Sequence, residues 1–151
     1  MSKMIRVTDG EKYIGRLSKG ADLLEEMTGR CMELGIRFSR IEAIGAVSRA
    51  RLAYYDQKER EYCHFDINEP LEIASLIGNI SLKDGQPMVH AHVTLADESG
   101  KTYGGHLAPG TIVFACEIVI QAFKEEPLKR GKDEETGLPL WEDEGLTSPL
   151  G

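Results

Sequence analysis

The chain has 151 residues, 41% of them hydrophobic and 28% charged, which fits one globular domain and argues against wholesale disorder. Its net charge of −7 disfavours generic DNA binding, because proteins that neutralise phosphates normally present a basic face. No segment approaches the roughly 20 apolar residues of a membrane helix, and the N-terminus lacks the apolar core of a signal peptide, so we expect a cytoplasmic protein without a membrane partner.

The first third of the chain predicts a hairpin and then a helix. Asp9-Gly10 is a two-residue turn signal between residues 6–8 and a strand over 11–17. A helix is expected over about residues 20–34, started by Ser18 or a neighbour and stopped by Gly35. Its apolar residues recur on one stripe at helical spacing: Leu23, Leu24, Met27, Cys31 and Leu34.

The middle of the chain reads as strands in hairpin order. Gly45 marks a bulge, and Ser99-Gly100 marks a hairpin turn. The last strand is nearly all apolar, which is typical of burial on both faces. The expected strands cover residues 41–47, 49–55, 61–67, 71–80, 89–96, 102–107 and 112–120. The pattern predicts an α/β fold of the α+β type, a mainly antiparallel sheet with a helix packed on one face.

The sequence changes character after residue 122. Residues 123–151 carry charge runs separated by three prolines, so we expect a C-terminal tail with little regular structure, outside a domain over residues 1–122. The apolar patch of this tail, residues 138–141, is expected to dock on the body or on a neighbouring subunit.

Three histidines on two neighbouring strands are the informative feature. Side chains alternate along a strand, so His90 and His92 share one face while the apolar residues between and around them face the core. A hairpin centred near Ser99 places His106 opposite His92, with Cβ atoms about 4.5–5.5 Å apart. Three imidazoles in that triangle can meet one ion at about 2.0–2.1 Å, which predicts a site for zinc or another divalent metal, with room left by the Gly104-Gly105 pair.

Three protein ligands leave a fourth position for water, an anion or a small molecule, as in open zinc sites. The three cysteines are poorly placed to close the shell: Cys31 lies on the helix stripe, Cys116 in the apolar strand, and Cys63 points away from its neighbour His64. Three solvated histidines on a polar hairpin face are the alternative, because a register slip of one residue would turn His106 to the opposite face.

Other polar residues are weaker candidates. His64 could approach the site or be an ordinary exposed histidine. Glu117 lies in the apolar strand and needs a partner if buried, so it could face the site as a general base or pair with Arg49 or Arg51. Glu72 raises the same question. The chain contains neither a phosphate-binding glycine loop nor a nucleophile elbow.

The chain resembles the plants-and-prokaryotes-conserved (PPC) domain of the stand-alone prokaryotic type, over about residues 5–122. The motifs that carry the resemblance are Arg16-Leu17-Ser18-Lys19-Gly20, Ile44-Gly45-Ala46-Val47, Tyr54-Tyr55-Asp56, the run 72–80, His90-Ala91-His92 and Gly104-Gly105-His106-Leu107. The resemblance implies an α/β fold with an antiparallel sheet and a homotrimer. It also implies that His90, His92 and His106 are zinc ligands, in a branch of the family that has no settled reaction.

Three functions remain open at this point. The first is a zinc-binding protein with an open site, which acts on a small molecule if it is an enzyme. The second is a DNA-associated regulatory module, as the plant members of the family are. This chain has no AT-hook, since the Arg-Gly-Arg-Pro core is absent, so direct DNA binding is doubtful. The third is a trimeric assembly module with a structural metal.

Overall fold

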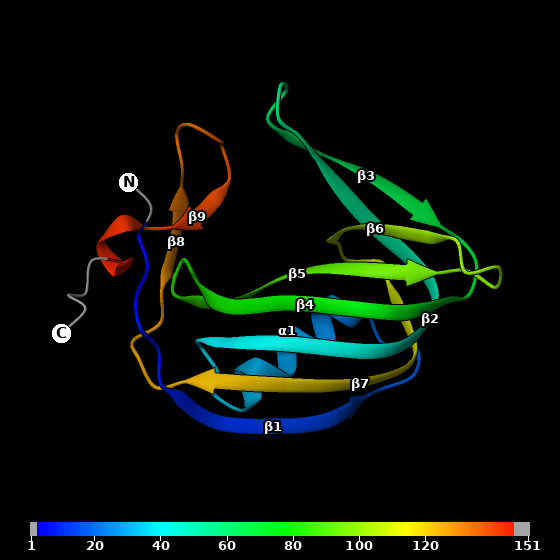
Figure 1. The fold of residues 1–151 in the computed structure, drawn as a ribbon, viewed down its shortest axis with the longest axis horizontal. Coiled ribbons are helices and arrows are strands. Elements are labelled where there is room, and N and C mark those ends of the chain that lie inside the picture. Colours follow the sequence, from blue (N-terminus) through cyan, green and yellow to red (C-terminus); the bar gives the residue numbers. More distant parts are fainter. Residues whose placement is uncertain (1–2, 147–151) are drawn as a thin grey trace.

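The computed structural model describes residues 3–146 and shows a mainly antiparallel sheet with one α-helix on one face, as the sequence predicts. Helix α1, Leu23–Glu33, lies behind the sheet in the view of Figure 1. The strands are β1 Asp9–Leu17, β2 Ser39–Asp56, β3 Glu61–Ile67, β4 Leu71–Lys83, β5 Gln86–Ala96, β6 Thr102–Leu107, β7 Ile112–Phe123, β8 Lys129–Lys132 and β9 Pro139–Trp141, followed by a short 3-10 helix, Asp143–Leu146. Within this described part of the chain, no helix is both long and apolar enough to span a membrane.

The predicted hairpin at Asp9-Gly10 is wrong. Both residues belong to the start of β1, where Asp9 pairs with Phe123 of β7. Residues 6–8 form no strand that could pair back onto β1, and the backbone N–H of Thr8 instead donates to the carboxylate of Glu125. A turn signal needs two strands to join, and here one partner is missing.

Helix α1 confirms the predicted element with a different start. Asp22 is the N-cap: its side chain accepts hydrogen bonds from the backbone N–H groups of Leu24 and Glu25, each at 3.0 Å. Ser18 lies before the helix, and its hydroxyl donates to Glu26. Gly35 adopts a left-handed φ of 67° just past the end, as expected. The buried stripe of the helix is Leu23, Met27 and Cys31.

Strand β2 organises the sheet. Its two predicted halves form one continuous strand, with the expected bulge at Gly45. Gly45 has a φ of 143°, and a Cβ there would lie 2.2 Å from the carbonyl oxygen of Ala115, so a side chain cannot be accommodated. The first half of β2 pairs with β7 and β4, and the second half pairs with β3 and β6. Because β5 pairs with β4 and β6, strands β2, β4, β5 and β6 close a cycle around buried aliphatic side chains.

Strand β7 is buried on one face only, which corrects the expected burial on both. Val113, Cys116 and Ile118 belong to the core, whereas Phe114 and Val119 on the other face are 54% and 43% exposed. The helix covers one side of the sheet, and within residues 3–146 nothing covers the other. The apolar composition of β7 therefore predicted burial of both faces, but in a single chain one of these faces stays exposed.

The segment after residue 122 is more regular than expected. Strand β8 pairs in parallel with the end of β4, and β9 folds back on β8 as a hairpin. Leu128 is buried, and the indole N–H of Trp141 donates to the hydroxyl of Ser81 at 3.0 Å. The apolar patch thus docks on the body of its own chain, the first of the two expected partners. Residues 147–151, including Pro149, lie outside the described residues.

Candidate metal centre

The three histidines converge as their register predicts. His92 of β5 stands directly opposite His106 of β6, and His90 lies one two-residue step along β5. The alternate residues Val89, Ala91, Val93 and Leu95 all point into the core. The histidine side chains therefore share the face of the hairpin that is turned away from the core, and the predicted register is confirmed.

The geometry of the cluster is close to that of a metal site. One ligand nitrogen from each of His90, His92 and His106 lies within 4.8 Å of the other two. The ring centroids are 5.1–5.5 Å apart. Two nitrogens on one tetrahedral zinc ion lie about 3.3 Å apart, given bonds of about 2.0–2.1 Å. That spacing falls within the 4.8 Å inside which the three ligand nitrogens lie.

The environment keeps two of these imidazoles neutral. Burial lowers the pKa of His90 to about 4, and the positive charge of Arg130 and the other two histidines of the cluster add to the effect. Burial also lowers the pKa of His106 to about 4, helped by His92 and His64. A metal ligand must offer a free lone pair, so neutral imidazoles are the form that binds.

One ring nitrogen of the cluster lacks a partner. Nδ1 of His106 is buried, and among the described residues no group hydrogen-bonds to it. A buried polar atom without a partner costs free energy, because its hydration is lost and not replaced. The three nitrogen donors and this unpartnered atom fit a bound transition-metal ion.

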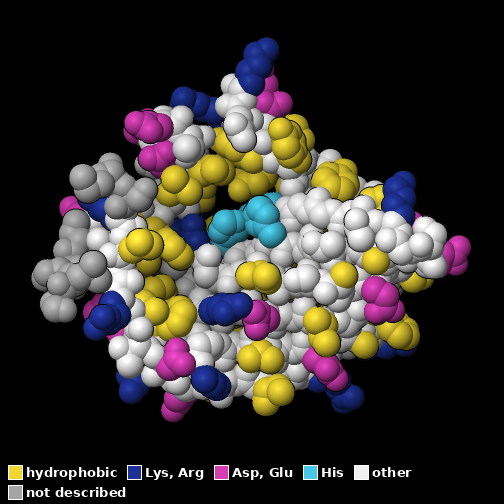
Figure 2. Space-filling model, viewed as in Figure 1, with side chains coloured by type: hydrophobic (Ala, Val, Ile, Leu, Met, Phe, Trp, Pro, Cys, Tyr) yellow, Lys and Arg dark blue, Asp and Glu magenta, His cyan; other side chains and the backbone are white. Residues whose placement is uncertain are grey.

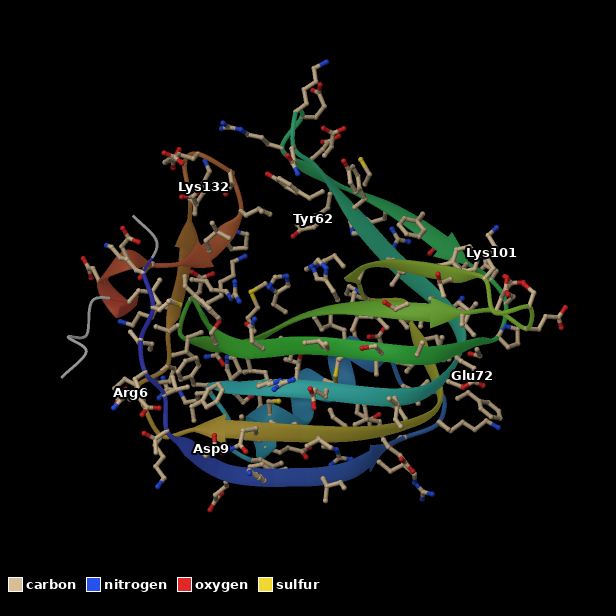
Figure 3. All side chains as sticks on the ribbon, in the orientation of Figure 1. Arg6, Asp9, Tyr62, Glu72, Lys101 and Lys132 are labelled. Atoms are coloured by element: carbon tan, nitrogen blue, oxygen red, sulfur yellow. The ribbon has the colours of Figure 1, made fainter. Side chains whose placement is uncertain are left out.

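The cluster forms part of the floor of a pocket of about 470 Å³. One wall is the β2–β3 hairpin, from which Tyr62 points toward the pocket (Figure 3) and stacks on His106 with ring centroids 4.7 Å apart. The opposite wall is the β8–β9 hairpin, which contributes Leu138, Pro139 and Leu140. Figure 2 shows the histidines at a hollow rimmed by hydrophobic side chains, with a basic side chain beside them.

Arg130 of β8 also lines this pocket. It is 8% exposed, and its guanidinium donates to Ser81, Asn79 and the carbonyl oxygen of Pro139 at 2.7–2.9 Å. Sequence reasoning missed both Arg130 and Tyr62 as pocket residues. Neither carries a local signal: Arg130 reads as one charge in a basic cluster, and Tyr62 as one aromatic residue of a strand.

The sequence profile of the Plants and Prokaryotes Conserved domain matches residues 4–124 of the chain. The chain belongs to this family. A solved metal-containing protein from Archaeoglobus fulgidus is 42% identical, covers 94% of this chain and 100% of its own, and superposes with a TM-score of 0.89. A Bacteroides thetaiotaomicron protein described as a candidate DNA-binding protein is 26% identical, covers 91% of this chain and 98% of its own, and gives a TM-score of 0.82.

Curated relatives of this PPC domain protein are much longer than it is. The bifunctional protein GlmU of Synechococcus sp. strain JA-3-3Ab is 35% identical over 127 residues. That alignment spans 83% of this chain but 19% of the relative. The matched segment is therefore a small part of a larger protein there.

His64 and Cys63 lie near the centre without joining it. His64 is on β3, opposite Ala53, whose other neighbour is His106. Neither His64 nor Cys63 belongs to the cluster of ligand atoms within 4.8 Å. Both side chains are exposed, so the interpretation of His64 as an ordinary exposed histidine is confirmed. Its charge still contributes to the lowered pKa of His106.

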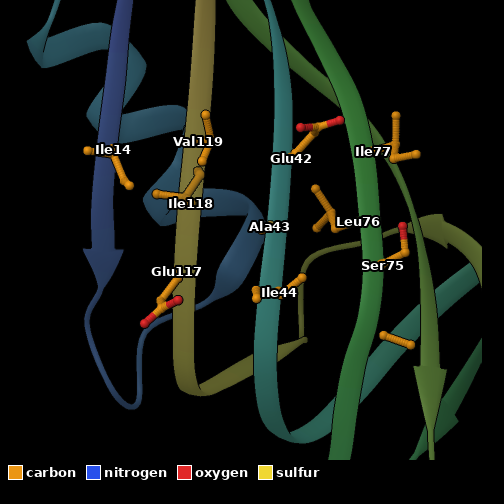
Figure 4. A pocket seen from close by; sticks show the side chains of 11 residues that line it. Ile14, Glu42, Ala43, Ile44, Ser75, Leu76, Ile77, Glu117, Ile118 and Val119 are labelled. Atoms are coloured by element: carbon orange, nitrogen blue, oxygen red, sulfur yellow. The ribbon is translucent and has the colours of Figure 1, made fainter.

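Glu117 is not near the histidines, which corrects its assignment as a neighbour of the site. It is exposed on the outer face of β7 and lines a different, mainly apolar depression with Ile14 and Ile44 (Figure 4). The alternative, a pairing of Glu117 with Arg49 or Arg51, is also wrong: among the described residues neither arginine forms an ion pair with Glu117, and Arg51 lies 3.8 Å from Asp66 instead. Because β7 buries its other face, an acidic residue here needs no buried partner.

Glu72 is also remote from the cluster. It is exposed at the start of strand β4, near the end of the sheet that carries Lys101 in Figure 3. The Gly104-Gly105 pair was expected to leave room beside the site, and Gly105 does so in part. A Cβ there would lie 2.9 Å from the carbonyl oxygen of Ala53, so glycine lets β6 approach β2 and brings His106 to its position.

Proposed function

We propose that the protein is a metal-binding PPC domain protein in which His90, His92 and His106 hold one divalent ion, zinc first. The observation that carries the proposal is the convergence of three ligand nitrogens within 4.8 Å at the floor of a pocket. The metal-containing relative from Archaeoglobus fulgidus, 42% identical over nearly the whole chain, supports it.

We propose further that the coordination shell is open. Within residues 3–146, no further histidine, cysteine or carboxylate joins the three histidines. Structural zinc is usually closed by four protein ligands, whereas three ligands leave a position for water or a small molecule. The pocket of about 470 Å³ above the cluster has room for such a molecule.

When bound, such an ion would polarise a carbonyl or phosphoryl oxygen or lower the pKa of a bound water. The residues of the chain would prepare the site for this. Tyr62 stacks on His106 and restricts the orientation of its ring. The aliphatic wall from the β8–β9 hairpin limits the access of water, which strengthens electrostatic interactions in the pocket.

A homotrimer is part of the same proposal. It rests on the family resemblance and on the uncovered apolar face formed by β1, β7, β2 and β4 (Figure 4). Ile14, Ile44 and Ile77 on this face are 87%, 57% and 56% exposed, and contiguous exposed apolar residues mark association surfaces. Ile77 stands opposite His92, so the histidine pocket borders the same face. We therefore place the metal site beside a subunit boundary.

Metal analysis tests the proposal directly. Protein purified without a polyhistidine tag is dialysed and measured for zinc. We expect about one zinc per chain in the wild type, less than a tenth of that in His92→Ala, and wild-type content in His64→Ala. The last variant is a matched control, because His64 lies outside the cluster. Equal zinc in all three proteins would refute the assignment.

A DNA-associated role is the second candidate, supported by the description of the Bacteroides thetaiotaomicron relative. The net charge of −7 opposes it. Phosphate contacts require exposed cations, and Arg130 cannot supply one because it is buried and lines the histidine pocket. We therefore rank this role below metal binding.

A further inference from the structure

Arg130 is buried in an unusual way for an arginine. It is 8% exposed, although long charged side chains are rarely buried unless they are paired. Three of its five N–H groups are used, by the hydroxyl of Ser81, the amide oxygen of Asn79 and the carbonyl oxygen of Pro139. All three acceptors are neutral. Two N–H groups remain for another partner.

The charge of Arg130 has no counter-ion. Among residues 3–146, no carboxylate forms an ion pair with it, although other cations of the chain do have such partners. An uncompensated buried charge is expensive, and burial lowers the pKa of this guanidinium. The side chain lines the histidine pocket and acts on His90 through its charge. The missing negative charge therefore belongs in the pocket.

We propose that Arg130 is an anion-binding residue of the histidine pocket, and that the molecule bound there is a small organic oxyanion, a carboxylate or a phosphate ester. The presence of a metal in the same pocket rests on the proposed function. The argument from the uncompensated charge of Arg130 does not depend on that metal. A guanidinium with free N–H groups suits such oxygens, because it can bind them with two parallel hydrogen bonds.

The apolar walls of the pocket indicate that the anion carries an organic group. Met88, Leu138 and Leu140 are apolar, and Tyr62 offers an aromatic face. A volume of about 470 Å³ exceeds what an inorganic ion needs and falls in the range of pockets for small organic ligands. The arginine at one side and the histidines at the floor would then contact the polar end of the molecule, and the β8–β9 hairpin its apolar part.

A purely structural role is the competing explanation. Arg130 does hold the β8–β9 hairpin, through the carbonyl oxygen of Pro139 and by lying 5.3 Å from the ring centroid of Trp141. Such a role explains the three hydrogen bonds but not the uncompensated charge, and it predicts no dependence of ligand binding on Arg130. The two explanations are separated by measuring anion affinity.

The experiment is calorimetric titration of the full chain, metal-free and zinc-loaded, with benzoate, phenyl phosphate and neutral benzamide. The variants are Arg130→Gln, Arg130→Lys and, as a matched control, Lys132→Gln, which removes an exposed cation from the same strand. We expect at least one anion to bind the wild type tenfold or more tighter than Arg130→Gln. Affinity should be unchanged in Lys132→Gln, and benzamide should bind equally weakly to all. The tighter of the two anions identifies the class.

Two outcomes would overturn the inference: anions that bind no better than benzamide, or equal anion affinity in the wild type and Arg130→Gln. If Arg130→Gln loses its circular dichroism spectrum, Arg130→Lys serves instead, and it should lose at least threefold because an ammonium cannot form the paired hydrogen bonds. If the metal proposal is wrong, this will be seen separately, because the wild-type protein will contain no zinc. The metal-free titration still tests Arg130 in that case.

Discussion

His92 and His106 face each other across β5 and β6 with their rings perpendicular and their centroids 5.5 Å apart. A directly opposed pair cannot separate without breaking the ladder between the two strands, so the strands hold two of the three proposed metal ligands at a set spacing. The third, His90, is fixed by the pleat of β5. The three proposed metal ligands are therefore largely preorganised by backbone hydrogen bonding.

The metal-free protein should lose stability as the pH falls, over a pH range that two histidines determine. The pKa values of His90 and His106 are about 4, below the ordinary value of 6.5. The unfolded chain therefore binds more protons between these values, so the stabilising contribution is complete above pH 6.5 and is lost as the pH falls toward 4. Urea denaturation at pH 7, 5.5 and 4 should show a falling free energy of unfolding.

The same shifts have a direct spectroscopic signature. At pH 5.5, we expect two imidazole signals in the nuclear magnetic resonance spectrum of the metal-free protein that are still in the neutral form. The variant His90→Gln/His106→Gln should lack both signals and should show a flatter dependence of stability on pH. Imidazoles that are all half protonated near pH 6.5 would contradict the prediction.

The apolar outer face should control assembly. A charge at Ile44, which is 57% exposed at the centre of this face, would have to be desolvated between subunits. We expect wild-type protein to elute as a trimer and Ile44→Lys to elute as a monomer in light scattering at micromolar concentration. Leu34→Lys is the control, because Leu34 is similarly exposed but follows the helix. A monomeric wild type would refute the trimer.

The N-cap of α1 should make a measurable contribution to stability. Asp22 accepts hydrogen bonds from the backbone N–H groups of Leu24, Glu25 and Gly110, and so ties the helix to the segment before β7. Replacing an N-cap aspartate by alanine costs about 0.5–2 kcal/mol. Asp22→Ala should lower the free energy of unfolding by that amount in urea, while Asp9→Ala, an exposed aspartate, should change it by less than about 0.5 kcal/mol.

DNA binding by the isolated chain should be weak and unspecific. We expect dissociation constants above 10 μM at physiological salt for duplexes of any sequence, as expected for a net charge of −7. Fluorescence anisotropy over a range of salt concentrations measures both affinity and its salt dependence. Submicromolar, sequence-selective binding would revive the DNA-associated role.

The convergence of the three histidines could be predicted from the sequence because their relationship is local. His92 and His106 are joined by one hairpin, and the turn at Ser99-Gly100 together with strand alternation determines which residues face each other. The helix stripe of Leu23, Met27 and Cys31 was predictable for the same reason, since it depends on spacing within one element. Both features need no knowledge of the rest of the fold.

The rest of the pocket could not be predicted, because it depends on contacts between distant segments. Arg130 reaches the site only because β8 pairs in parallel with the end of β4, a pairing between residues about 47 positions apart. The predicted placement of Glu117 beside the site was wrong for a related reason. An apolar strand does not say which of its faces a helix will cover, and β7 leaves the face of Glu117 open.

One wall of the pocket comes from a different part of the chain than its floor. The family match ends at residue 124, so it includes the three histidines but not the β8–β9 hairpin that supplies Arg130 and the aliphatic wall. A relative with another segment after this position would keep the same three nitrogens and present a different surface to whatever enters. In such a molecule, ligand selectivity can diverge by exchange of the appended hairpin, while the chemistry of the centre stays the same.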